Sequence, residues 1–274
     1  MTISTSRRPR RQAPKLRERQ ALEFIAHGKT ARLDQVAQVL APGCAPAIDD
    51  EPRRRLRKDE PKPPPKAKGG THTWPLGRHQ RVAATLPLVN DWMGWRLALK
   101  VHALDDMPDW VFPTEVGLRW LGLSYTPIEF PTGDLPHIYL INEIRLFLMR
   151  STKIPAYAWT SERELEMQEP RKTRGLELPH RPDGIMTIET GGELTVNDQV
   201  LHLRAGERLA VEAERSRKEF DELREVLPDL LRHYDRAWYF CGPGAYDAVS
   251  KERAKLPHEE QRRIQVFRPR RDDV

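Results

Sequence analysis

Residues 180–190 read HRPDGIMTIET and residues 206–214 read GERLAVEAE. Each stretch runs from a turn into apolar residues, which predicts strands at Gly184 to Glu189 and at Glu207 to Glu214. Side chains alternate between the two faces of a strand, so Glu212 and Glu214 share a face. If the two strands pair, Asp183 joins the two glutamates in one acidic patch.

The residues on either side of these strands alternate between helical and extended patterns. The expected order is helix, three strands, helix, strand, helix, strand, which indicates an α+β or α/β sheet with helices packed on its faces. The expected helices are His137 to Arg150, Ser216 to Tyr234 and Ala245 to Lys255, and the expected strands are 157–159, 184–189, 207–214, 237–241 and 263–267.

Three clustered carboxylates repel one another, and a cation favours their joint ionisation. A hard divalent ion such as Mg²⁺ takes oxygen ligands of this kind. We therefore expect Asp183, Glu212 and Glu214 to be catalytic residues that bind Mg²⁺. Lys218, four residues after Glu214, is placed to hold the nucleophile or a phosphate. The alternative is an acidic patch at a strand edge that pairs with neighbouring arginines.

Three further side chains near this core leave alternatives open. Glu143, on the helix before the sheet, is either an additional acidic ligand or a surface glutamate. His137 and His180 flank the core and either contact phosphate or have a structural role. The acidic residues that follow Ser161 suit the first turn of a helix.

The first third of the chain has the pattern of a helical DNA-binding unit. Apolar residues recur at helical spacing in residues 16–28 and again in residues 30–40, with a short turn between them. An arginine-rich segment at 53–58 would be the third helix of a helix-turn-helix. A longer amphipathic helix is expected over residues 81–104, and a short helix is expected to start near Thr114.

These patterns divide the chain into three parts. We expect a basic arm over residues 1–16 and a helix-turn-helix or winged-helix region over residues 17–132. A Pro-rich basic linker at 49–72 lies within that region, and an α/β domain covers residues 133–274. The acidic residues Asp183, Glu212 and Glu214 of this domain resemble those of nucleases, and the resemblance implies a nuclease-like domain.

Positive charge is concentrated at the start of the chain. Residues 1–70 hold 17 Lys and Arg against 8 Asp and Glu, whereas the rest holds 29 against 32. Basic clusters that neutralise DNA phosphates release counterions and give salt-sensitive affinity. A solubilising tail is the alternative for a single basic run, but two runs flank a helical segment here, which favours DNA as a partner. The expected DNA-binding residues are Arg7, Arg8, Arg10, Arg11, Arg53, Arg54, Arg55, Arg57 and Lys58.

Several classes of protein do not fit the sequence. No stretch approaches the roughly 20 apolar residues that a membrane-spanning helix needs. The N-terminal residues lack the apolar segment of a secretory signal. The two cysteines, Cys44 and Cys241, form no disulfide framework or cysteine-rich zinc site. We therefore expect a cytoplasmic protein with no membrane partner.

The arrangement of acidic residues resembles a known superfamily. Pro182-Asp183, followed by Glu212-x-Glu214 with Glu212 29 positions after Asp183, is similar to the core of the PD-(D/E)xK nucleases. In that superfamily a helix, a hairpin and a crossing helix present Asp, Glu and Lys around Mg²⁺. This chain has Glu214 where the usual motif has lysine. Some members carry Glu-x-Glu, and others place the lysine on the next helix, where Lys218 lies.

A second resemblance covers residues 17–245. The chain resembles the replication-relaxation family, whose members occur on plasmids, phages and integrative elements of Gram-positive bacteria. The motifs that carry it are Pro113-Thr114-Glu115-Val116-Gly117-Leu118, His137-x-x-x-x-Asn142-x-x-Arg145, Trp159-Thr160-Ser161-Glu162-Arg163-Glu164-Leu165, His180-Arg181-Pro182-Asp183-Gly184 and Val211-Glu212-Ala213-Glu214-x-x-x-Lys218.

The resemblance implies a DNA-binding protein of plasmid or mobile-element replication, relaxation or mobilisation. One hypothesis is a Mg²⁺-dependent endonuclease or nickase in which Asp183, Glu212 and Glu214 hold the metal. The alternatives are a catalytically inactive DNA-binding accessory factor and a transcriptional repressor whose C-terminal domain mediates dimerisation. Expected partners are therefore DNA, a second copy in a homodimer, and replication or mobilisation proteins.

Overall fold

A computed structural model describes residues 14–40, 78–103, 107–128, 134–150, 155–168, 180–196, 199–215 and 220–268. Its helices are α1 (Leu16–His27), α2 (Leu33–Leu40), α3 (Arg78–Gly94), α4 (Glu115–Leu121), α5 (Leu135–Arg150), α6 (Glu162–Gln168), α7 (Phe220–His233), α8 (Pro243–Arg253) and α9 (His258–Arg263). Its strands are β1 (Ala31–Arg32), β2 (Ala98–Val101), β3 (Trp110–Pro113), β4 (Tyr157–Ser161), β5 (Gly184–Ile188), β6 (Gly192–Val196), β7 (Gln199–Leu203), β8 (Arg208–Glu214), β9 (Arg236–Cys241) and β10 (Ile264–Phe267).

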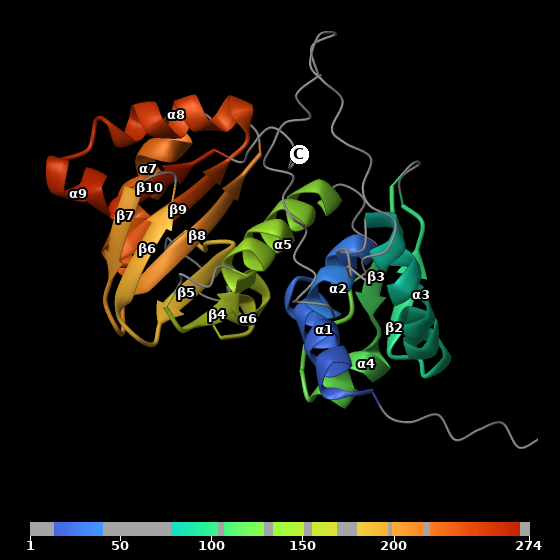
Figure 1. The fold of residues 1–274 in the computed structure, drawn as a ribbon. Helices are drawn as coiled ribbons and strands as arrows, with labels where there is room; N and C mark the ends of the chain where they lie inside the picture. The colour runs from blue at the N-terminus through green and yellow to red at the C-terminus, as the bar shows by residue number, and fades with distance from the viewer. Residues whose placement is uncertain are drawn as a thin grey trace, which may run out of the picture.

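The elements from α1 to α4 form a helical unit with a small sheet, called here the N-terminal unit. Its strands pair antiparallel in the order β1-β3-β2, and α1, α2 and α3 pack against them (Figure 1). Trp92 of α3 is fully buried in the centre of this core, and its indole N–H donates to Glu18 of α1. Burial of the apolar faces of three short helices is what stabilises this unit.

The expectations for this unit have different outcomes along the chain. The helix expected over 81–104 is wrong at its C-terminal end, because α3 ends at Gly94 and β2 begins at Ala98. Arg96 adopts a positive φ of 59°, which turns the chain, and pairing with β3 then satisfies the backbone. The helix expected at 53–58 and the nine expected DNA-binding residues lie outside the described residues. The short helix expected after Thr114 is confirmed as α4, capped by the Thr114 hydroxyl.

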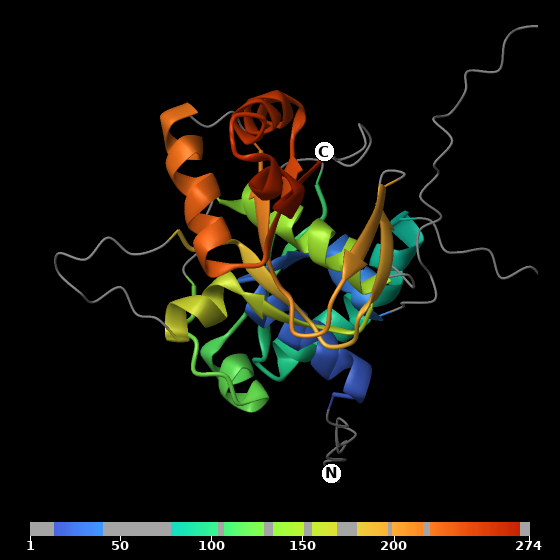
Figure 2. The same cartoon turned by 90° about the vertical axis from the view of Figure 1, so that its left-hand side faces the viewer.

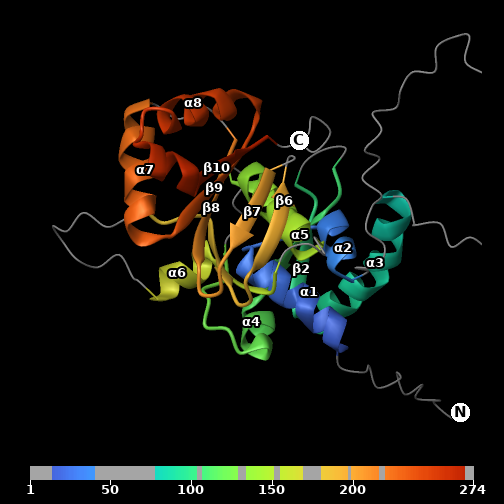
Figure 3. The same cartoon turned by 60° about the vertical axis from the view of Figure 1, so that its left-hand side comes forward.

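The second half of the chain is built on a five-stranded mixed sheet in the order β10-β9-β8-β5-β4. Strands β4, β5 and β8 are antiparallel neighbours, whereas β8, β9 and β10 run parallel. Helix α5 covers one face, and α7 and α8 cover the other (Figures 1 and 3). These elements, from α5 onward, are called here the sheet unit.

The structure confirms a chain of mixed α and β structure. The expected helices and strands of the sheet unit are present with shifts of a few residues at their ends. The hairpin of β6 and β7, inserted between β5 and β8, was not expected. Its apolar residues Leu194, Leu201 and Leu203 pack on the α5 side of the sheet (Figure 2). No helix in the described part of the chain is long and apolar enough to cross a membrane.

Helix α5 belongs to the sheet unit and also contacts the N-terminal unit. Toward the sheet it contributes Ile144 and Leu148 to the core. Toward the N-terminal unit, the amide of Asn142 donates to the carbonyl of Thr30 at 2.8 Å, and Nη1 of Arg145 donates to the carbonyl of Phe24 at 3.1 Å. These polar contacts are buried, so they fix how the helix meets the N-terminal unit.

The C-terminus of α1 is capped from the sheet unit by two arginines. Arg145 bonds the carbonyl of Phe24, and Nη1 of Arg163 on α6 bonds the carbonyl of Ala26 at 2.8 Å. The last carbonyls of a helix have no partner within the helix and carry partial negative charge, so cations stabilise them. Burial lowers the pKa of both arginines to about 10, which leaves them charged near neutral pH.

Replacing Arg145 by methionine should destabilise the protein. The substitution keeps an unbranched side chain but removes the hydrogen bond from the charged guanidinium to the carbonyl of Phe24, which then accepts only from the N–H of Gly28 among the described residues. Loss of a buried hydrogen bond from a charged group costs about 2 kcal/mol. Urea unfolding of Arg145→Met against wild type measures the loss. Arg119→Met is the control, because Arg119 is exposed and forms an ion pair with the exposed Glu115 four residues earlier. Equal effects of the two substitutions would contradict the capping role.

Candidate functional site

Asp183 lies directly before β5 and is held by two other elements. Gly184 pairs with Val211 in antiparallel register, so Asp183 and Glu212 are the next residues along the two strands. Oδ2 of Asp183 accepts a hydrogen bond of 2.7 Å from the backbone N–H of Ala213 on β8. Oδ1 lies 2.9 Å from Nε2 of His137 on α5. Strand pairing thus brings Asp183 to Glu212, as the sequence predicts.

The two glutamates of β8 are buried. Glu212 is 5% exposed and Glu214 is 7% exposed. Their register partners on β9, Tyr239 and Cys241, belong to the core under α7 and α8, so the glutamates lie on that side of the sheet. Oε1 of Glu212 lies 2.9 Å from Nε2 of His180. Burial, together with these carboxylates, raises the pKa of the Tyr239 hydroxyl well above its usual value.

The carboxylates are of the chemical type that suits Mg²⁺, since carboxylate oxygens are the ligands hard cations prefer. Within the described ranges, no group of three or more His, Cys, Asp or Glu side chains is arranged to hold a metal ion. Asp183 reaches toward α5, whereas Glu212 turns toward His180. Lys218 lies outside the described residues.

Two histidines, His137 and His180, contact the candidate carboxylates, and the sequence did not predict these pairings. His137 contacts Asp183 and His180 contacts Glu212, so each histidine pairs with one candidate metal ligand. The hydrogen bond to Asp183 raises the pKa of His137 against the opposing effect of burial, and the charges of Glu162 and Glu212 add to the rise. Both pairings join residues more than 30 positions apart, which strand and helix patterns alone do not reveal.

The expectation of a helix after Ser161 is confirmed by α6, which begins with a capping box. The Ser161 hydroxyl accepts from the N–H of Glu164, and the Glu164 carboxylate accepts from the N–H of Ser161. The N–H of Glu162 donates to the carbonyl of Asp183 at 3.1 Å. The start of α6 is thereby tied to the segment that carries Asp183.

Glu143 has a different environment from the carboxylates above. Its Oε1 accepts from Nε2 of Gln35 on α2 at 2.8 Å, so it lies at the contact between α5 and the N-terminal unit. Burial there raises its pKa. Neither alternative weighed from the sequence, an additional ligand or a surface glutamate, describes this position.

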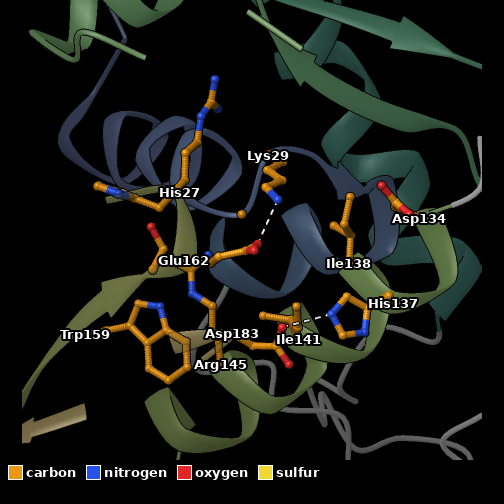
Figure 4. A pocket seen from close by; sticks show the side chains of 13 residues that line it. His27, Lys29, Asp134, His137, Ile138, Ile141, Arg145, Trp159, Glu162 and Asp183 are labelled. Carbon is orange, nitrogen blue, oxygen red and sulfur yellow. Dashed lines mark hydrogen bonds and ion pairs between the residues drawn. The ribbon is translucent and has the colours of Figure 1, made fainter. Parts of the chain in front are cut away.

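A cavity of about 240 Å³ lies between the N-terminal unit and the sheet unit (Figure 4). Nζ of Lys29, from the turn after α1, donates to Oε2 of Glu162 at 2.7 Å across it. Asp183 and His137 lie on the opposite side of the cavity from Lys29. The lining residues are His27, Gly28, Lys29, Asp134, His137, Ile138, Ile141, Arg145, Trp159, Ser161, Glu162, Arg163 and Asp183.

Comparisons of the chain with protein-family models, with curated proteins and with solved structures find no match.

Gly184 should not tolerate a side chain. A Cβ at this position would lie 2.2 Å from Cζ2 of Trp159, so the indole ring would have to move. We expect Gly184→Ala to lower the free energy of unfolding by about 1–3 kcal/mol, the usual cost of overpacking.

Thermal or urea unfolding measures this loss. Gly244→Ala is the matched control, because a Cβ at Gly244 meets no atom within 4 Å and lies in the first turn of α8. The contact between Gly184 and Trp159 would be unimportant if both variants were as stable as wild type.

Proposed function

We propose that this protein binds DNA of a plasmid or another mobile element and acts on it as a Mg²⁺-dependent endonuclease or nickase. The observation that carries the proposal is the juxtaposition of Asp183 and Glu212 on the paired strands β5 and β8. They lie in a unit that begins with helix α5, continues with the sheet strands β4, β5 and β8, and goes on to helix α7 and strand β9, with α6 inserted after β4 and the β6–β7 hairpin inserted after β5. This order agrees with the PD-(D/E)xK core that the sequence resembles.

The N-terminal unit supports the DNA-binding part of the proposal. Its order of helix, strand, helix, helix, strand, strand, with the sheet order β1-β3-β2, agrees with that of a winged helix. In a winged helix of this order, α3 would be the helix that enters the major groove.

In the sheet unit, the proposed ligands of Mg²⁺ are Asp183, Glu212 and Glu214. Among the described residues these carboxylates form no three-ligand group, so their side chains would have to turn from their present partners to hold the ion. When bound, the ion would stabilise charge on the scissile phosphate and lower the pKa of a water molecule. The chain itself orients these carboxylates: the N–H of Ala213 and the ring of His137 fix Asp183, and His180 fixes Glu212. Lys218, between β8 and α7 in sequence, would position the water or the phosphate.

A second candidate is a DNA-binding accessory factor without catalysis. Its specific support is that Asp183 and Glu212 are already paired with histidines, and that Glu214 occupies the place of the motif lysine. In this case the sheet unit would contribute a binding surface only. A transcriptional repressor belongs to the same class.

Asp183→Asn separates the two candidates. Supercoiled plasmid is incubated with wild type or variant, with Mg²⁺ or with a chelator, and nicking and gel retardation are read from the same samples. The endonuclease hypothesis predicts metal-dependent nicking that falls at least about 100-fold in the variant, since losing even an outer partner of a metal ligand costs up to about 100-fold. Retardation should be preserved.

The control is Asp247→Asn, because Asp247 is 80% exposed on α8. It should nick and bind like wild type. Retardation without nicking in all three proteins would favour the accessory factor.

The basic arm gives an independent prediction about DNA affinity. Deleting residues 1–15 removes Arg7, Arg8, Arg10, Arg11 and Lys15. Affinity should fall equally for unrelated DNA sequences, and the slope of log K against log salt should become shallower by about 0.9 for each lost phosphate contact. Fluorescence anisotropy over a KCl series measures both. A slope equal to that of the full chain would show that the arm does not contact phosphates.

A further inference from the structure

Lys29 has an unusual backbone conformation for its residue type. Within the described residues, only Lys29 (φ 70°) and Arg96 (φ 59°) are non-glycine residues with positive φ. Lys29 follows Gly28, the C-cap of α1, which has an ordinary φ of −85°. Helices commonly end with a glycine in the left-handed conformation at the position after the C-cap. Here the lysine, not the adjacent glycine, adopts it.

The side chain of Lys29 offers a reason why a lysine, and not a glycine, occupies this position. It extends from the N-terminal unit into the cavity and pairs with Glu162 of α6 (Figure 4). The two side chains are about 30% exposed, 29% and 30% respectively. Both side chains therefore keep part of their surface accessible. A non-glycine residue held at positive φ beside a cavity points to a functional role for its side chain.

The cavity around Lys29 can accept an anion. Arg145 and Arg163 line it and donate to backbone carbonyls, and no carboxylate in the described part of the chain is hydrogen-bonded to either. Lys29 is the third permanent cation of the lining. Asp134, Glu162 and Asp183 supply three carboxylates, and His27 and His137 can add positive charge. The lining therefore carries no excess of negative charge that would exclude a phosphate.

We propose that this cavity receives a phosphate of the DNA backbone and that Lys29 holds it. The inference rests on the proposed function, because the phosphate is that of the bound DNA. Phosphate oxygens are strong acceptors for an ammonium group and would replace the carboxylate of Glu162. The cavity of about 240 Å³ is many times the roughly 10–15 Å³ that one water molecule needs by the same measure, so it can hold a group larger than water.

The position of the cavity gives this contact a consequence for the sheet unit. Asp183 and His137 line the same cavity as Lys29. A phosphate held by Lys29 would therefore lie beside the candidate catalytic carboxylate. The N-terminal unit would contribute a substrate-binding residue to the site on the sheet, so binding by one unit would position DNA for the other.

The test measures binding of a fluorescently labelled DNA duplex to the full chain in the presence of a chelator, over a KCl series. Lys29→Asn and Lys29→Gly should each lower affinity about 5- to 10-fold near 0.1 M salt and reduce the salt slope by about 0.9, the effect of one phosphate contact. Both replacement residues adopt positive φ more readily than lysine. Their melting temperatures should therefore not fall below that of wild type.

Two further variants sharpen the test. Glu162→Gln removes the carboxylate that competes with phosphate for Lys29, so affinity should rise. Arg96→Asn is the matched control, since it also removes a cation at positive φ in the N-terminal unit, but Arg96 does not line the cavity. Its salt slope should equal that of wild type.

The outcomes distinguish this inference from the proposed nuclease activity. A reduced slope for both Lys29 variants supports the inference even if wild type does not nick plasmid. An unchanged slope and affinity for both overturn it even if wild type does nick. An equal reduction for Arg96→Asn also overturns it, because the effect would then be one of general charge. If wild type does not bind DNA, the inference and the proposed function both fail.

Discussion

The last carbonyl groups of α1 are the point on which the arrangement of the two units depends. They lie at the negative end of a helix dipole, and Arg145 of α5 and Arg163 of α6 donate to them from the sheet unit. The two arginines are buried, so their hydrogen bonds to these carbonyls add to the backbone bonds from Gly28 and Lys29 in a site from which water is excluded. The turn that carries Gly28 and Lys29 follows directly, and its position is set by the same two contacts.

Much of the sheet unit could be predicted from the sequence because its signals are local. The apolar runs that became β5 and β8, and the helical spacing that became α5 and α7, each depend on neighbouring residues only. The short strands β2 and β3 lack such a local signal, because the four residues of each strand are stabilised by pairing with the four residues of the other. Trp92 and Trp95 are three residues apart, as on one face of a helix, so the apolar pattern gives no signal that the chain turns at Arg96.

In the candidate site, too, local features could be predicted from the sequence and tertiary contacts could not. The meeting of Asp183 and Glu212 follows from strand pairing, which the sequence predicts. The partners that complete the site come from distant elements: His137 is 46 positions from Asp183, and Lys29 is 133 positions from Glu162. Tertiary packing alone brings them together. The only sequence signal for His137 was its place in a motif of the replication-relaxation family, and that motif does not specify its partner.

The pairing of carboxylates with histidines bears on both candidate functions. A buried carboxylate such as Glu212 needs a hydrogen-bonded or cationic partner, because desolvation penalises its charge. His180 satisfies this need in the protein alone, and His137 does the same for Asp183. An endonuclease would require these carboxylates to turn part of their coordination toward a metal ion, whereas an accessory factor would keep the histidine pairs when DNA binds. The two functions therefore differ in which partner the carboxylates retain.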